Sequence, residues 1–164
     1  MIQRIQSLFL LVGAGLHILF FFIVFWTAQT NISESSESKI IKMSVYQVVE
    51  YSKDENAELN SEIQIFPLIL NIVIIALALI TIFLFKNRVL QNKLCRLLIL
   101  LNTGLIVLLI FAHGKVKESI LDSYVANFDY IGISLPILGL ILFFITGRTI
   151  MKDEKKIRSV DRLR

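Results

Sequence analysis

Four long apolar stretches without a charged side chain constrain the fold of this chain more than any other feature. Residues 7–28 and 63–85 contain no Asp, Glu, Lys or Arg, and residues 97–112 and 131–146 are shorter but equally free of charge. At about 1.5 Å per helical residue, the two longer stretches reach across the ~30 Å hydrocarbon core of a bilayer. The composition agrees, because 55% of the residues are hydrophobic and 18% are charged, against about 25% charged in a soluble domain. The sequence therefore predicts an integral membrane protein.

The predicted fold is an all-α membrane protein in which four transmembrane helices form a bundle, with a short β-hairpin or a surface helix in the first outer loop. The whole chain, residues 1–164, is expected to form one membrane domain. Its expected segments are the spans at about 7–28, 63–85, 94–112 and 129–146, the outer loops 29–62 and 113–128, the cytoplasmic loop 86–93 and the basic cytoplasmic tail 147–164.

The distribution of Lys and Arg predicts the orientation. Twelve of these residues lie in the N-terminal segment, the middle loop and the tail, whereas the two other loops hold five. Basic residues accumulate on the cytoplasmic side of membrane proteins, so both termini are expected in the cytoplasm.

The two outer loops are expected to carry some structure of their own. Residues 29–62 hold seven acidic residues against three basic ones, and residues 41–51 carry several apolar side chains at alternate positions. That period is typical of a strand or a hairpin arm. A helix on the membrane surface would also accommodate Val45, Val48 and Val49, so both interpretations stay open. In the second outer loop, residues 119–128 are expected to form a turn or two of surface helix.

The tail, residues 147–164, is expected to continue the fourth helix beyond the membrane. The apolar residues that helical spacing brings near one stripe are Ile150, Ile157, Val160 and Leu163. The tail has seven basic and three acidic residues, so it can rest on anionic lipid headgroups, where each base contributes about 1 kcal/mol. A solvated charged helix explains the same composition equally well.

Both ends of the chain resemble a known family. The opening Met1-Ile-Gln-Arg-Ile-Gln6, the Leu135-Pro136 pair and the run from Arg148 to Arg164 are similar to an uncharacterised family of small bacterial four-span membrane proteins, described only as a domain of unknown function. The resemblance covers the whole chain and is most specific in the first six and last seventeen residues. It implies a four-span fold in the bacterial inner (cytoplasmic) membrane and implies no activity. The tail positions that match the family, and form a candidate interaction site, are Arg148, Lys152, Asp153, Glu154, Arg158, Ser159, Asp161 and Arg162.

Three polar residues within the spans, His17, Asn71 and Asn102, form a candidate intramembrane site. A buried ionisable group in a membrane can carry protons or bind haem or a metal ion. Hydrogen bonding across helices is the commoner use, so we expect a neutral imidazole bonded to one of the asparagines or to a backbone carbonyl. His113 is expected at the outer end of the third span, about 15 Å from His17 along the membrane normal at ~1.5 Å per residue. The two histidines are therefore not expected to share a ligand site.

The sequence carries no catalytic motif. Ser134 and His113 are expected at similar depth, but no Gly-x-Ser-x-Gly, His-Glu-x-x-His or phosphate-binding glycine loop accompanies them. No span holds Asp, Glu, Lys or Arg at depth, so transport coupled to a buried carboxylate has no residue to carry it. The single cysteine, Cys95, excludes a Cys-x-x-Cys redox pair. We therefore expect no enzyme activity and no catalytic, metal or cofactor-binding residues.

The preferred functional hypothesis is a non-enzymatic membrane protein that binds a partner, or acts as a scaffold component, through the basic tail or the outer loop. The expected partners are anionic lipid headgroups at the tail and a protein, which can be a second copy of the chain; nucleic acid is not expected. The alternative is a small oligomeric transporter or channel component that uses His17, Asn71 and Asn102. A neutral substrate would need no buried charge.

Overall fold

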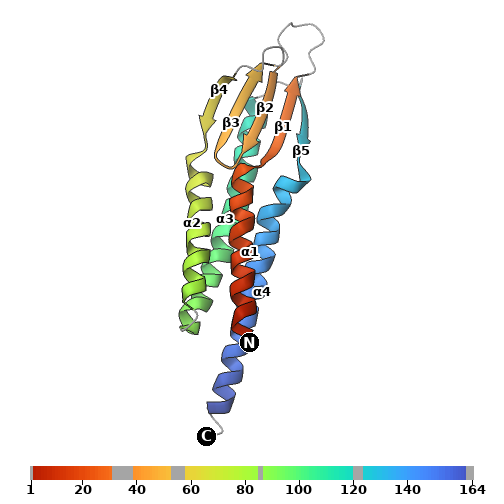
Figure 1. Ribbon diagram of the computed structural model, residues 1–164. Helices are drawn as coiled ribbons and strands as arrows, with labels where there is room; N and C mark the ends of the chain where they lie inside the picture. Colours follow the sequence, from red (N-terminus) through yellow and green to blue (C-terminus); the bar gives the residue numbers. More distant parts are fainter. Residues whose placement is uncertain (1, 31–38, 53–57, 85–86, 120–123, 162–164) are drawn as a thin grey trace.

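The computed structural model describes residues 2–30, 39–52, 58–84, 87–119 and 124–161, and the structural statements below concern these residues (Figure 1). Its helices are α1 (Ile2–Phe22), α2 (Ile65–Phe83), α3 (Arg88–Ser119) and α4 (Tyr130–Asp161). Its strands are β1 (Val24–Thr30), β2 (Lys39–Ser44), β3 (Gln47–Ser52), β4 (Glu58–Ile63) and β5 (Tyr124–Phe128).

Each of the four helices contains a stretch that is long and apolar enough to cross a membrane. Between 28% and 39% of each stretch is buried inside the molecule, so most of its apolar side chains face outward. In α2, for example, Phe66 and Phe83 are 77% and 78% exposed. An apolar surface this large is stable when it faces lipid and costly when it faces water. The chain is therefore a membrane protein.

The four helices pack side by side, each against two neighbours, in the order α1, α2, α3, α4 and back to α1 (Figure 1). Small residues set the closest approaches between them. At Gly13 of α1, a Cβ atom would lie 2.6 Å from Cε1 of Phe143 in α4. Close approach of this kind is a common way for helices to associate in lipid, because lipid removes the hydrophobic drive between them.

The expectation of an all-α protein is wrong, because the chain also forms an antiparallel sheet. Five strands pair in the order β4-β3-β2-β1-β5. Of the two alternatives for the first outer loop, a hairpin is the one that forms, as β2 and β3. It belongs to a larger sheet that also takes in β1 and β5, and β5 is separated from the others by two helices.

In β2, buried and exposed side chains alternate, and the buried ones mark the inner face of the sheet. Ile41 and Met43 of β2 are buried and Lys42 between them is exposed. In β1, Ala28 pairs with Ile41 and Trp26 pairs with Met43. The Trp26 ring meets the ring of His113 in α3 edge-on at 4.9 Å. The inner face of the sheet therefore packs on the last turns of α3.

Several element ends differ from the sequence prediction. The first helix ends at Phe22, and residues 24–28, expected inside the first span, lie in β1. The sequence there is Val-Phe-Trp-Thr-Ala, whose β-branched and aromatic residues favour a strand. In the second loop, α3 continues to Ser119, and residues 124–128 form β5 instead of the expected surface helix.

Single residues join the sheet to three of the helices. Ile23 links α1 to β1, Gln64 links β4 to α2, and Asp129 links β5 to α4. Backbone hydrogen bonds fix two of these links: the Gln64 N–H donates to the Tyr46 carbonyl at 2.8 Å, and the Asp129 N–H donates to the Phe25 carbonyl at 3.0 Å.

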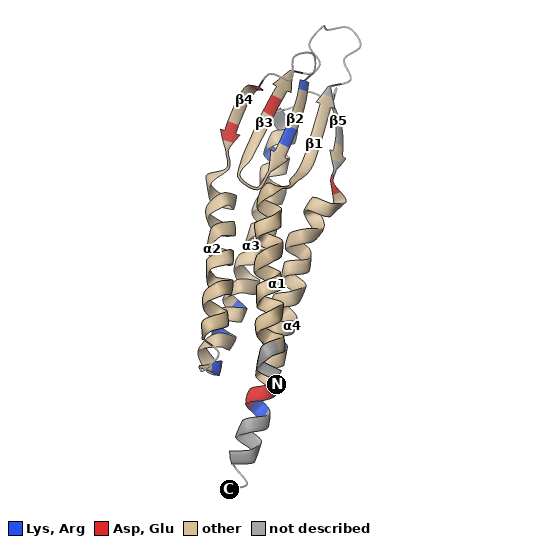
Figure 2. Cartoon of the chain, viewed as in Figure 1, with Lys and Arg blue, Asp and Glu red and all other residues tan. Residues whose placement is uncertain are grey.

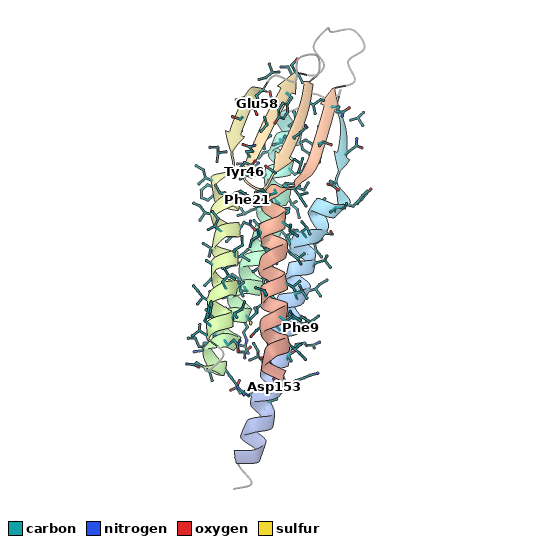
Figure 3. All side chains as sticks on the ribbon, viewed as in Figure 1. Phe9, Phe21, Tyr46, Glu58 and Asp153 are labelled. Carbon is teal, nitrogen blue, oxygen red and sulfur yellow. The ribbon has the colours of Figure 1, made fainter. Side chains whose placement is uncertain are left out.

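An aromatic contact closes the corner where α1 meets the β2–β3 turn. Figure 3 shows Phe21 and Tyr46 side by side at this corner. Their rings stack with centroids 5.1 Å apart. The sheet is thus held on the helices by side-chain packing as well as by its three short links.

Charged side chains gather at the two ends of the molecule. Figure 2 shows acidic and basic residues on the strands, basic residues in the first turns of α3 at the opposite end, and tan helices in between. We call these the sheet end and the tail end. Both chain termini lie at the tail end (Figure 1).

Candidate functional site

The three polar residues predicted as an intramembrane site lie in the middle of the helices. His17 comes from α1, Asn71 from α2 and Asn102 from α3, and the side chains of all three have no exposed surface. Because each interrupts an apolar stretch, each must find its hydrogen-bonding partners inside the protein.

His17 and Asn71 join through two hydrogen bonds. The amide Nδ2 of Asn71 donates to the backbone carbonyl of His17 at 3.2 Å. Its Oδ1 therefore faces Nδ1 of the imidazole, at 2.8 Å, and can only accept. Nδ1 must carry the ring proton, and Nε2 is a bare acceptor. Of the partners expected for His17, Asn71 is the one to which its imidazole bonds.

Asn102 belongs to the same region but contacts a different helix. Its Nδ2 donates to the Pro136 carbonyl of α4 at 3.1 Å. Gly139, one turn further along α4, brings the two parts together. A Cβ atom at Gly139 would lie 2.9 Å from Nε2 of His17 and 3.5 Å from Nδ2 of Asn102. All four helices therefore contribute to one polar cluster, which we define as His17, Asn71, Asn102 and Gly139.

Two acceptor atoms of the polar cluster have no hydrogen-bond partner among the described residues: Nε2 of His17 and Oδ1 of Asn102. On its other side, the imidazole stacks on the Phe143 ring, with centroids 5.9 Å apart and planes 8° apart. The cluster can join helices and accept hydrogen bonds. Besides the imidazole, it holds no side chain that titrates or acts as a nucleophile.

A metal site is not formed by the described part of the chain. No group of three or more His, Cys, Asp or Glu side chains in these ranges is arranged to hold an ion. Cys95 is buried. Ser134 donates its hydroxyl to the Ile131 carbonyl of its own helix at 2.8 Å, which is the local back-bonding that serine commonly makes in a helix.

The first turn of the predicted tail makes contacts within α4 and with α1. The Arg148 guanidinium carbon lies 5.0 Å from the centre of the Phe144 ring. Nε2 of Gln6 in α1 donates to Oδ2 of Asp153 at 2.6 Å, and Figure 3 shows Asp153 close to the start of α1. Lys152 is exposed, and Glu154 is half-buried.

Beyond this turn, α4 continues as a helix past the ends of the other three helices (Figure 1). Of the remaining candidate tail residues, Arg158, Ser159 and Asp161 fall in the helical part of this extension, and their side chains lie outside the described structure. Arg162 lies wholly outside it.

Three features of these sites were not found from the sequence. Gly139 was visible only as a glycine deep in a span, and its role depends on facing His17. Gln6 stood in a mixed polar segment and gave no sign of pairing with Asp153. Trp26, which falls in the stretch 7–28 expected as the first span, lies in β1 and is 1% exposed. Its β-favouring neighbours were the available signal.

Comparison with known proteins places the chain in a family. No curated protein matches the chain significantly. A family described as "Domain of unknown function (DUF4293)" matches residues 2–163. This match spans every described helix and strand, so it concerns the whole fold, the polar cluster and the tail together. The chain belongs to this family of unknown function, DUF4293.

Proposed function

We propose that the protein is a non-enzymatic membrane protein that binds a partner protein through the projecting end of α4. The observation that carries this proposal is the continuation of α4 past the ends of the other helices (Figure 1). Residues 154–161 follow the Gln6–Asp153 contact, and eight helical residues extend about 12 Å at ~1.5 Å each. We call residues 154–161 the projecting segment.

Contacts at its base keep the projecting segment in a defined direction. The Gln6–Asp153 hydrogen bond ties it to α1, and Nη2 of Arg96 lies 3.7 Å from Sδ of Met151, which ties it to α3. A helix held at its base presents its side chains without a large entropic cost on binding. This arrangement supports binding to a protein, because the segment continues the line of the α4 span away from the membrane.

The proposed location is the bacterial cytoplasmic membrane, with both termini in the cytoplasm. The uneven distribution of Lys and Arg supports it, and so does the position of both chain ends at the tail end. In this orientation Arg148 and Lys152 lie near the headgroups, where anionic lipid would contribute about 1 kcal/mol per base. Their charge would also favour a partner with an acidic surface.

Site-specific crosslinking tests the proposed partner. A photo-reactive residue in place of the exposed Lys155, in the full chain in native membranes, is expected to give one discrete crosslinked protein. The same residue in place of Leu100, which is 66% exposed on the span of α3, is the matched control and is expected to crosslink lipid. The double substitution Lys152→Glu and Lys155→Glu, with the photo-reactive residue at Met151, is expected to abolish the protein adduct. Equal adducts at 155 and 100, or none at 155, would contradict the proposal.

The two unpartnered acceptors of the polar cluster favour a second candidate, a transporter or channel component for a neutral solute. A bare Nε2 and a bare Oδ1 in the centre of the helices are groups to which a passing solute can donate hydrogen bonds. Solute flux into proteoliposomes that is lost in His17→Ala and kept in Thr103→Ala would favour this candidate. Thr103 is a suitable control because its hydroxyl bonds only to the Ile99 carbonyl of its own helix.

A further inference from the structure

An apolar cavity lies between α3 and α4 at the sheet end of the helices. Its volume is about 350 Å³, at the lower end of the range for ligand pockets. Phe20, two residues before the end of α1, and Phe25 of β1 close it on one side. Ile106 of α3 and Ile133 of α4 form facing walls.

The cavity opens among side chains that face the membrane. Ile110 of α3 and Ile137 of α4 also line it, and they are 64% and 43% exposed. Both belong to stretches long and apolar enough to span a bilayer. The surroundings at this opening are therefore lipid hydrocarbon and not water.

The chemistry of the walls excludes a polar occupant. Among the lining residues, His113 alone carries a polar side chain. A buried water needs two to four polar partners, and these walls do not provide them. The polar cluster is close, because Phe20 lies one turn from His17 and Ile106 one turn from Asn102, but neither His17 nor Asn102 lines the cavity.

We propose that this cavity is a binding site for a lipid, and that one hydrocarbon chain of a phospholipid from the leaflet at the sheet end occupies it. The chain enters between Ile110 and Ile137 and packs against Phe20 and Phe25. Its headgroup stays outside the cavity, at the membrane surface on the sheet end. The site is separate from the projecting segment of α4, which lies at the other end of the molecule. An experiment that refutes lipid binding here therefore leaves the proposed partner binding by the projecting segment untouched, and the reverse also holds.

Trp26 provides a reporter for the occupant. It is the only tryptophan of the chain. Its ring contacts His113, which lines the cavity, and only 1% of its surface is exposed. A quencher in the surrounding lipid therefore has no direct access to the indole ring. A quencher carried on an acyl chain inside the cavity is separated from the indole ring only by the side chain of His113.

The test uses the full-length protein in phosphatidylcholine vesicles with and without bromine atoms on the acyl chains. In the wild type, brominated lipid is expected to quench Trp26 fluorescence. Ile133→Phe fills the cavity from α4 and is expected to remove most of this quenching. Leu100→Phe adds the same ring bulk on the lipid face of α3, thirteen positions before His113, or about 20 Å away at ~1.5 Å per residue, and is expected to leave the quenching unchanged.

The outcomes separate binding in the cavity from general contact with lipid. Equal quenching in wild type and in a folded Ile133→Phe variant would overturn the proposal, and so would an absence of quenching in the wild type. Ile106→Phe fills the cavity from the opposite wall and answers the same question if Ile133→Phe does not fold. Native mass spectrometry supplies a second readout: the wild type and Leu100→Phe are expected to retain one phospholipid after delipidation, and the filled variants none.

Discussion

At the scale of single residues, the sequence shows which buried side chains need a hydrogen bond more readily than it shows which residue provides it. His17 and Asn71 each interrupt an apolar stretch, so each was expected to hydrogen-bond across helices, and the structure joins them at 2.8 Å. Asn102 was expected to be an equally good partner for His17, but it donates to Pro136 instead. Which of the two asparagines faces the imidazole depends on the rotation of three helices about their axes, and the periodicity of a uniformly apolar stretch does not fix that rotation.

Asn71→Ala is expected to destabilise the folded protein. It removes the acceptor for Nδ1 of His17, and a hydrogen bond between membrane helices contributes roughly 1 kcal/mol. Thermal unfolding in detergent measures the effect. Thr103→Ala, which removes a hydroxyl bonded within its own helix, is the control, and an equal loss of stability in the two variants would refute the role given to Asn71.

Gly139→Ala and Gly15→Ala are expected to change stability in opposite directions. At Gly139 a methyl group would lie 2.9 Å from Nε2 of His17, whereas at Gly15 no heavy atom lies within 4 Å. Overpacking costs about 1–3 kcal/mol, and an alanine in an open helical position gains about 0.5–1 kcal/mol over glycine. Thermal unfolding in detergent measures both changes in stability. A stabilised Gly139→Ala variant would show that α4 does not pack as described.

At the scale of elements, long apolar helices could be predicted and the sheet could not. An apolar, charge-free stretch has few alternatives to a spanning helix. A strand is stable only when it pairs with another strand. β1 pairs with β5, and Phe128 of β5 lies opposite Trp26 although the two residues are far apart in the sequence. The pattern of residues 41–51 indicated a strand or hairpin arm beside the alternative of a surface helix, because β2 and β3 are adjacent in the sequence. Residues 24–28 continued an apolar run and were therefore assigned to the helix.

Asp129→Ala is expected to loosen the start of α4. Oδ1 of Asp129 accepts the Ile131 N–H at 3.0 Å, which makes the residue an N-cap, and removing such a cap costs about 1 kcal/mol. Hydrogen exchange of the first turn of α4 is expected to accelerate, while exchange in the middle of α4 stays unchanged. Ser134→Ala is the control, because it removes a hydroxyl that is hydrogen-bonded to the Ile131 carbonyl near the start of α4. Its hydrogen exchange is expected to stay as in the wild type. Unchanged exchange in Asp129→Ala would rule out the capping role.

At the scale of the whole molecule, the membrane class and the number of spanning helices follow from the sequence, because they depend on composition along the chain and not on contacts. The all-α fold class was wrong because the pairing of β1 with β5 joins segments on both sides of α2 and α3, and no local pattern predicts such a pairing. Both chain ends at the tail end agree with an even number of spans.

Cysteine labelling tests the arrangement across the membrane. Asn60→Cys places an exposed thiol on β4 and Lys155→Cys places one on the projecting segment. A membrane-impermeant maleimide added to intact spheroplasts is expected to label only position 60, and to label position 155 after the membrane is opened. The native Cys95 is buried and gives the background. Labelling of both positions from the same side would refute four spans.

The three one-residue links have a mechanical consequence. Ile23, Gln64 and Asp129 join the sheet to α1, α2 and α4 by one residue each, and the stack of Phe21 on Tyr46 adds a side-chain contact. A force on the outer strands is therefore expected to act on the sheet ends of three membrane helices at once.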